Sequence, residues 1–126
     1  DLAALRLDRE SAELSGRAFS RDPVSGSPRR LIVEAVFGEP DALILGQVSA
    51  DEYTLERRTL ADALPPLIAD ERGRCLTPEL TARVARAARS LDDELGQAVE
   101  LTFAVSGGKV VARSWRALQP YELLTK

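Results

Sequence analysis

The sequence AVELTFAVSGGKVVARSWR, residues 98–116, alternates apolar and polar side chains on both sides of a Gly-Gly pair. Such alternation is typical of two β-strands that face a core on one side, and adjacent glycines favour a tight hairpin turn. The hairpin carries an acid, Glu100, on its first strand and a base, Arg116, on its second. Whether the two charges share a face therefore distinguishes a candidate binding site from an ordinary edge hairpin.

The loop length decides the register of this hairpin, because successive side chains of a strand point to opposite faces. A two-residue Gly-Gly loop pairs Glu100 with Trp115 and places Arg116 on the opposite face. A three-residue loop that starts at Ser106 pairs Glu100 with Ser114 instead.

We prefer the three-residue loop, because it separates polar from apolar side chains better and is a common hairpin type. It leaves Arg113 as the only misfit on its apolar face, which comprises Val99, Leu101, Phe103, Val111 and Trp115. The polar face comprises Glu100, Thr102, Ser114 and Arg116. This polar face is either a site for a cation and phosphate or, by default, a solvated sheet face.

The composition limits the possible functions. The chain has 126 residues, 44% of them apolar, which suits one domain or one lobe with its own core. A net charge of -3 and a pI near 5.1 argue against nucleic acid as a partner. No run approaches the roughly 18 apolar residues of a membrane span, and no charged-then-apolar leader begins the chain. We therefore expect a cytoplasmic protein without a membrane partner.

The residue types that are missing exclude further chemistry. The chain has no His, so it offers no imidazole base and no His-containing metal cluster. Cys75 is its only cysteine and is interpreted as an inert loop thiol. The chain also lacks Met and starts at Asp1, so we expect a single lobe, residues 1–126, cut from a larger multidomain protein.

Local patterns predict short strands and one long helix. The predicted strands are 12–20, interrupted at Gly16, 31–37, 52–57 and the two arms of the hairpin. Thr77 as cap, Pro78 in the first turn and Gly96 at the end define the helix. This mixture predicts an α+β fold, a mostly antiparallel sheet covered by helices.

Three further expectations concern side chains. Leu80, Val84, Ala87, Ala88, Leu91 and Leu95 form the predicted apolar stripe of the helix. Arg89 and Asp93 are spaced as an i,i+4 ion pair. Glu34 lies inside an otherwise apolar strand, which points to a cation, an Arg or a strand end nearby.

Four motifs then occur in a family order: SGRAFSRDPVSG (15–26), IVEAVFGEPDALILGQVSADEY (32–53), the helix, and ELTFAVSGGKVVARSWR (100–116). The chain resembles the second half, or C-terminal lobe, of the ATP-grasp nucleotide-binding domain of the family of phosphoenolpyruvate synthase, pyruvate phosphate dikinase and rifampicin phosphotransferase. The likeness covers almost the whole chain, from about Ala12 to Arg116.

The resemblance implies an ATP site with Mg²⁺ as the metal. Glu100 matches the family Glu that helps hold the metal–nucleotide complex, and Arg116 matches the Arg that contacts phosphate. Ser114 stands where the family has Gln. Asp41 matches an acid of the glycine-rich piece, and Arg21 matches the loop after the first strand, whose first role we take to be structural.

The resemblance also implies partners outside this chain. In the family, the first ATP-grasp lobe completes the ATP site, and a His of a phosphocarrier domain passes the phosphoryl group from ATP to pyruvate or another small acceptor. The chain is thus expected to be the ATP-binding lobe of a dikinase-type phosphotransferase, inactive when isolated. Ser114, Val99 for an Asp, Pro40 for a Gly and Leu7 for a hinge Gln depart from the family pattern. These departures favour the alternative, a degenerate or separately expressed lobe that serves as a structural or protein-interaction module.

Overall fold

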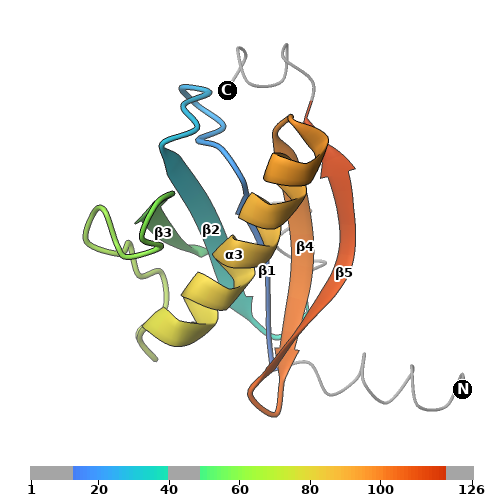
Figure 1. Ribbon diagram of the computed structural model, residues 1–126. Helices are drawn as coiled ribbons and strands as arrows, with labels where there is room; N and C mark the ends of the chain where they lie inside the picture. Colours follow the sequence, from blue (N-terminus) through green and yellow to red (C-terminus); the bar gives the residue numbers. More distant parts are fainter. Residues whose placement is uncertain (1–12, 40–48, 119–126) are drawn as a thin grey trace, which may run out of the picture.

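The computed structural model describes residues 13–39 and 49–118. Within these ranges, five strands form one antiparallel sheet in the order β3-β2-β1-β4-β5, and one helix, α3, crosses one face (Figure 1). The elements are β1 (Leu14–Phe19), β2 (Arg30–Phe37), β3 (Asp51–Glu56), α3 (Pro78–Leu95), β4 (Val99–Ser106) and β5 (Lys109–Ala117). The predicted α+β class and antiparallel sheet are confirmed. The sequence predicted more than one helix over the sheet, whereas the described residues form a single helix.

Strand β1 is the centre of the sheet and is continuous, so the predicted interruption at Gly16 is wrong. A Cβ atom at Gly16 would lie 1.9 Å from the carbonyl oxygen of Glu34 and 2.7 Å from Cζ of Phe103. Only glycine lets the Phe103 ring approach the strand this closely. Gly16 is therefore a packing requirement of the core.

Helix α3 begins and ends as predicted. The Thr77 side chain accepts a hydrogen bond from the N–H of Leu80 at 3.2 Å, and Gly96 ends the helix with a left-handed φ of 69°. The predicted apolar stripe is partly confirmed: Val84 and Ala88 are buried, and Leu80 and Leu91 pack against the core, but Ala87 and Leu95 are exposed. The buried residues are Thr81, Val84, Ala85, Ala88 and Asp92. Over the described residues, no helix combines the length and hydropathy needed to cross a membrane.

The predicted ion pair between Arg89 and Asp93 on this helix does not form. Arg89 Nη1 instead donates to the carbonyl oxygens of Arg57 at 2.8 Å and Arg58 at 3.4 Å. Asp93 accepts a hydrogen bond from Arg57 Nη2 at 2.7 Å. Both helix residues thus tie α3 to the segment that follows β3.

The main core lies between α3 and the sheet. Burying each of its larger apolar side chains contributes roughly 1.5–3 kcal/mol. Its members at most 2% exposed include Ala18, Leu31, Val33, Ala35, Tyr53, Leu55, Leu76, Val84, Leu101 and Phe103. Because these residues close the helix-covered face, a ligand site on the sheet has to use the other face.

A buried acid anchors the irregular segment between β3 and α3. The Asp51 carboxylate accepts hydrogen bonds from the Tyr53 hydroxyl at 2.6 Å and from the N–H groups of Ala69 at 2.9 Å and Cys75 at 2.8 Å. Burial raises the pKa of Asp51, but these hydrogen bonds outweigh it, so the pKa lies below its usual 3.8. Burial also raises the pKa of the Cys75 thiol to about 12, which agrees with an inert thiol.

The β4–β5 hairpin differs from both predicted registers. Its loop has two residues, Gly107 and Gly108, with φ of 59° and 75°, so the preferred three-residue loop is wrong. A β-bulge then adds Arg113 to β5 without a partner on β4 and shifts the register by one residue. Beyond the bulge, Glu100 lies directly opposite Arg116.

The polar grouping predicted for the hairpin is nevertheless confirmed. Its members are Glu100, Thr102, Ser114 and Arg116. The apolar grouping is partly wrong, because Val111 lies opposite Ala104 and is 52% exposed. Ala112 takes the expected place opposite Phe103.

Candidate functional site

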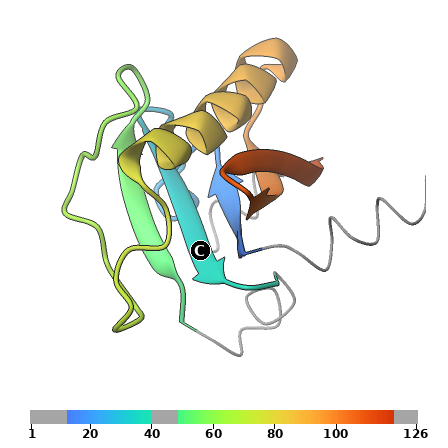
Figure 2. The same cartoon turned by 90° about the horizontal axis from the view of Figure 1, so that it is seen from below.

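The sheet face opposite α3, called the open face below, carries no helix in the described part of the molecule (Figure 2). The strand registers arrange its side chains in rows that cross all five strands. One row is Glu52, Glu34, Arg17, Thr102 and Ser114. The next row is Thr54, Ile32, Phe19, Glu100 and Arg116. Charged and hydroxyl side chains from distant parts of the sequence thus share one surface.

An ion pair occupies the middle of this face. Arg17 Nε and Nη2 lie 3.0 and 2.6 Å from Oε1 of Glu34, so an Arg is the neighbour of Glu34 among those expected from the sequence. The Arg17 guanidinium also lies 5.5 Å from the centre of the Phe19 ring. Both side chains of the pair are about a quarter exposed, at 25% and 24%, so the pair stabilises the fold by at most about 1 kcal/mol. Such a pair can exchange partners with a ligand at little cost.

The three hairpin residues predicted for the site come together at the β4–β5 end of the open face. Arg116 Nε lies 3.5 Å from Oε2 of Glu100, and the two side chains are 52% and 13% exposed. Ser114 lies opposite Thr102 at the next same-face position and is exposed. An acid, a hydroxyl and a guanidinium thus lie on neighbouring positions of two strands.

A hollow of about 380 Å³ lies on the open face over β1, β2 and β3. Its lining includes Arg17, Arg30, Glu34, Glu52, Val24 and Leu64. Among the described residues, neither the Arg30 guanidinium nor the Glu52 carboxylate has a hydrogen-bond or ion-pair partner. Neither residue was among the predicted site residues, although the alternation of 51–56 places Glu52 on the side away from the core.

Arg21, also predicted for the site, contacts the helix instead of the hairpin residues. Its Nε lies 2.9 Å from Oδ2 of Asp92, and its Nη2 lies 3.0 Å from Oδ1. The Ser20 hydroxyl donates to the same carboxylate at 2.7 Å and accepts from the N–H of Val99 at 2.8 Å. Burial raises the pKa of Asp92, but the hydrogen bonds from Arg21 and Ser20 outweigh it, so the pKa lies below 3.8. Arg21 therefore holds β1 and its loop against α3.

Asp41 lies outside the described residues, as do Pro40 and Leu7. Over the residues that the structure describes, no group of three or more His, Cys, Asp and Glu side chains is placed to hold a metal ion. Within the described ranges, Glu100 would thus be a single carboxylate ligand. One carboxylate suits Mg²⁺, which keeps several waters and takes further oxygens from a substrate's phosphates.

Comparisons with known proteins identify the family of the chain. The family model described as pyruvate phosphate dikinase, AMP/ATP-binding domain, matches residues 3–102, a range that includes Glu100 and ends before Ser114 and Arg116. The chain is 29% identical over 122 residues to the "Probable phosphoenolpyruvate synthase" of Archaeoglobus fulgidus, over 79% of this chain and 16% of that protein. It is 25% identical over 118 residues to the "Uncharacterized phosphotransferase YvkC" of Bacillus subtilis, over 79% of this chain and 14% of that protein. The chain thus spans less than a fifth of the length of these relatives.

Proposed function

The chain belongs to the family of the AMP/ATP-binding domain of pyruvate phosphate dikinase, and on this premise we propose that its open face is one wall of the ATP site of a dikinase-type phosphotransferase. The fold is proposed to be the C-terminal lobe of an ATP-grasp unit. A first lobe on the same or another polypeptide supplies the opposite wall.

The pairing of Glu100 with Arg116 on the open face carries this proposal. A guanidinium binds phosphate oxygens through two parallel N–H groups, which suits Arg116 as a ligand of the ATP phosphates. The contact between Arg116 Nε and Glu100 Oε2 is long, at 3.5 Å, and Arg116 is 52% exposed, so its guanidinium is accessible to a phosphate oxygen. Ser114 offers a hydroxyl at the position where the family has Gln.

Mg²⁺ fits the proposed site through Glu100, because the nucleotide provides most of the remaining ligands. The ion would neutralise charge on the phosphates and so favour phosphoryl transfer. The protein's own part is to hold the Glu100 carboxylate at the wall of the site and Arg116 beside the phosphate oxygens. Glu100 and Arg116 lie opposite each other on adjacent strands, so both side chains can contact the same ligand.

The later steps of the proposed reaction require other domains. The chain has no His, so the proposed relay from ATP to a phosphohistidine, and then to pyruvate or another small acceptor, uses a His on a phosphocarrier domain elsewhere. We expect the isolated chain to be inactive, because positioning and charge neutralisation come from several sides.

The decisive test joins this chain to the upstream sequence of its reading frame and measures binding of Mg-ATP by titration calorimetry. We expect Glu100→Ala and Arg116→Ala each to weaken binding by about tenfold or more, the size of one lost charge-assisted hydrogen bond. Glu94→Ala and Arg86→Ala, on exposed positions of α3, are matched controls and should leave binding unchanged.

Unchanged affinity in the two open-face variants would contradict the proposal. Absence of Mg-ATP binding by a folded joined protein would favour the alternative, a degenerate lobe that serves as a structural or interaction module. The replacement of the family Gln by Ser114 is the specific observation that supports this alternative.

A further inference from the structure

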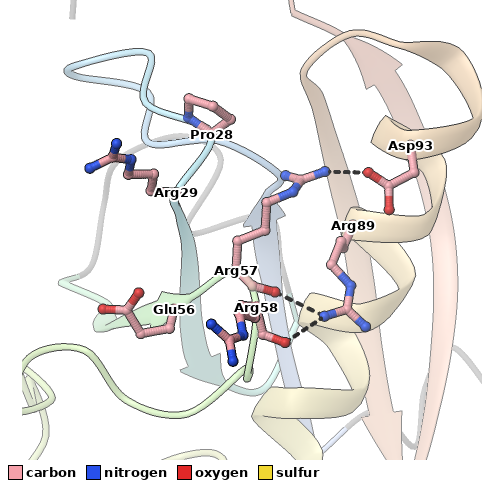
Figure 3. Close-up of a pocket in the computed structure, with 7 residues that line it drawn as sticks. All are labelled: Pro28, Arg29, Glu56, Arg57, Arg58, Arg89 and Asp93. Carbon is pink, nitrogen blue, oxygen red and sulfur yellow. Dashed lines mark hydrogen bonds and ion pairs between the residues drawn. The ribbon is translucent and has the colours of Figure 1, made fainter.

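An arginine-rich hollow lies apart from the open-face site, between α3, the start of β2 and the end of β3 (Figure 3). Its volume is about 840 Å³, within the range of sites for small molecules. Its lining is Pro28, Arg29, Glu56, Arg57, Arg58, Arg89 and Asp93. Four arginines face two carboxylates, so the hollow has two positive charges in excess although the whole chain has a net charge of -3.

Two of these arginines are fixed by the fold. Arg57 donates from Nη1 to the carbonyl oxygen of Ser20 at 2.9 Å and from Nη2 to Asp93 at 2.7 Å. Arg89 donates from Nη1 to the carbonyl oxygens that follow β3, which leaves its Nε and Nη2 groups without a partner among the described residues. Arg57 and Arg89 therefore form a preorganised wall, and part of that wall still offers donors.

The other two arginines are not used by the fold. In the described part of the chain, no hydrogen bond or ion pair engages the guanidinium of Arg29 or of Arg58, and both side chains are exposed. Figure 3 shows them reaching from different segments, with neither joined by a dashed line through its guanidinium. The Asp93 carboxylate is paired with Arg57, so it does not neutralise the charges of Arg29 and Arg58.

The chemistry of this cluster suits one class of ligand. Guanidinium groups match the oxygens of a phosphate through paired N–H donors, and each charge-assisted hydrogen bond is stronger than a neutral one. A dianion would offset the two excess positive charges and the mutual repulsion of Arg29, Arg58 and Arg89.

We propose that the hollow lined by Arg29, Arg58 and Arg89 binds a phosphate dianion, free or as the monoester of a small molecule, at a site separate from the open face. Arg29 and Arg58 are the mobile ligands and Arg89 the fixed one. The site requires neither Mg²⁺ nor the other lobe, so the 126-residue chain is sufficient to test it.

The test follows backbone amide signals of the ¹⁵N-labelled chain during titration with inorganic phosphate and, in a second arm, glycerol 3-phosphate, at constant ionic strength set by chloride. We expect saturable shifts at residues 29, 57, 58 and 89. Arg29→Ala and Arg58→Ala should each weaken binding at least threefold, and the double variant at least tenfold. Arg83→Ala removes an exposed arginine of α3 outside the hollow and should change nothing.

The two arms identify the source of the phosphate. Tighter binding of the ester assigns the hollow to a phosphorylated small molecule, and equal affinities assign it to the free ion. Shifts that do not saturate, or an affinity unchanged in the double variant, would overturn the proposal. So would binding of a glutamate-rich peptide at these residues with no binding of phosphate, which would assign the surface to an acidic protein segment.

Discussion

The two faces of the sheet use acids and arginines in different ways. On the helix side, Asp51 and Asp92 are 1% and 3% exposed, and each carboxylate accepts several hydrogen bonds. On the open face, Glu34 and Glu100 each have a single arginine partner that is 25% or 52% exposed. A buried charge has to be fully satisfied by the fold, whereas an exposed pair leaves hydrogen-bonding capacity for a ligand.

This difference separates residues that stabilise the fold from residues that are available for binding. Arg21 and Arg116 were both candidates for the ATP site. Two nitrogens of Arg21 donate to the buried carboxylate of Asp92, whereas Arg116 is 52% exposed and its Nε lies 3.5 Å from Oε2 of Glu100. If the comparison is right, substitutions on the helix side change the free energy of unfolding most, and substitutions on the open face change ligand affinity.

The largest expected effect is that of Gly16→Ala. The new methyl group would overlap the Glu34 carbonyl oxygen and the Phe103 ring, so we expect a loss of about 3 kcal/mol in the free energy of unfolding, measured with urea. Gly26→Ala is the control, because it has open space around it and only a positive φ of 76°. It should cost about 1 kcal/mol. Equal losses of unfolding free energy in the two variants would show that the packing of Phe103 does not require glycine at position 16.

Asp92→Ala should come next, with a loss of about 3 kcal/mol or slightly less, because it removes the shared partner of Ser20, Arg21 and Arg57. Its exposed neighbour is a matched control. Asp93 is 65% exposed, so Asp93→Ala should cost under about 1 kcal/mol by the same urea measurement. A loss below that of the control would refute a structural role for Asp92.

Acid should weaken the helix side selectively. Asp51 and Asp92 have pKa values below 3.8 in the folded protein, so their stabilisation is fully present above that pH and is lost as the pH falls through the folded values. We expect the free energy of unfolding to fall below about pH 4, and Asp92→Asn to fall less steeply. Urea titrations between pH 2 and pH 7 measure this, and equal slopes for both proteins would contradict it.

Arg17→Ala should cost about 1 kcal/mol or less, because the pair with Glu34 is partly exposed. Salt screens an exposed pair, so the cost should shrink further in 1 M NaCl. Urea unfolding at low and high salt tests both statements, with Arg30→Ala as the unpaired control. A salt-independent loss would indicate that packing of the Arg17 stem on Phe19 matters more than charge.

Arg116→Ala should have the smallest effect on stability, under about 0.5 kcal/mol, as expected for a half-exposed side chain. The same variant is expected to lose Mg-ATP affinity in the joined protein. Thermal unfolding of the variant and of the parent chain measures the first effect. A loss of several kcal/mol would assign Arg116 to the fold and remove the distinction between the faces.

Local signals made much of the fold predictable. Thr77, Pro78 and Gly96 act within one helical turn, so they located both ends of α3 without knowledge of the rest of the chain. The apolar run of β2 and the expectation of a cation, an Arg or a strand end near Glu34 were likewise contained in the sequence. The α+β class followed from these elements.

The contacts that depend on distant segments were not predictable in the same way. Asp92 follows Ala88 by four positions on the buried side of α3, but its partners Ser20 and Arg21 lie more than 70 residues away and no local pattern identifies them. Arg89 and Asp93 are correctly spaced to pair with each other, yet both bind the segment at Arg57. Spacing along a helix predicts which residues can meet and does not predict which partner is better.

The sequence predicted which hairpin residues share a face of the sheet, but it did not predict which of them lie opposite each other. Polarity alone placed Glu100 and Arg116 together, because alternation determines which side chains share a surface. It did not predict that the two lie directly opposite each other, because the extra residue in β5 disturbs the alternation at one position only. Arg113, the misfit of the predicted hairpin, was the sole trace of that extra residue.

The bulge at Arg113 also affects how this hairpin has to be aligned with its relatives. A single added residue inside β5 changes the pairing of everything beyond it, while the two glycines of the turn stay a regular two-residue loop. Homologues should therefore be superposed on the ladder that contains Glu100 and Arg116 rather than on the two glycines of the turn.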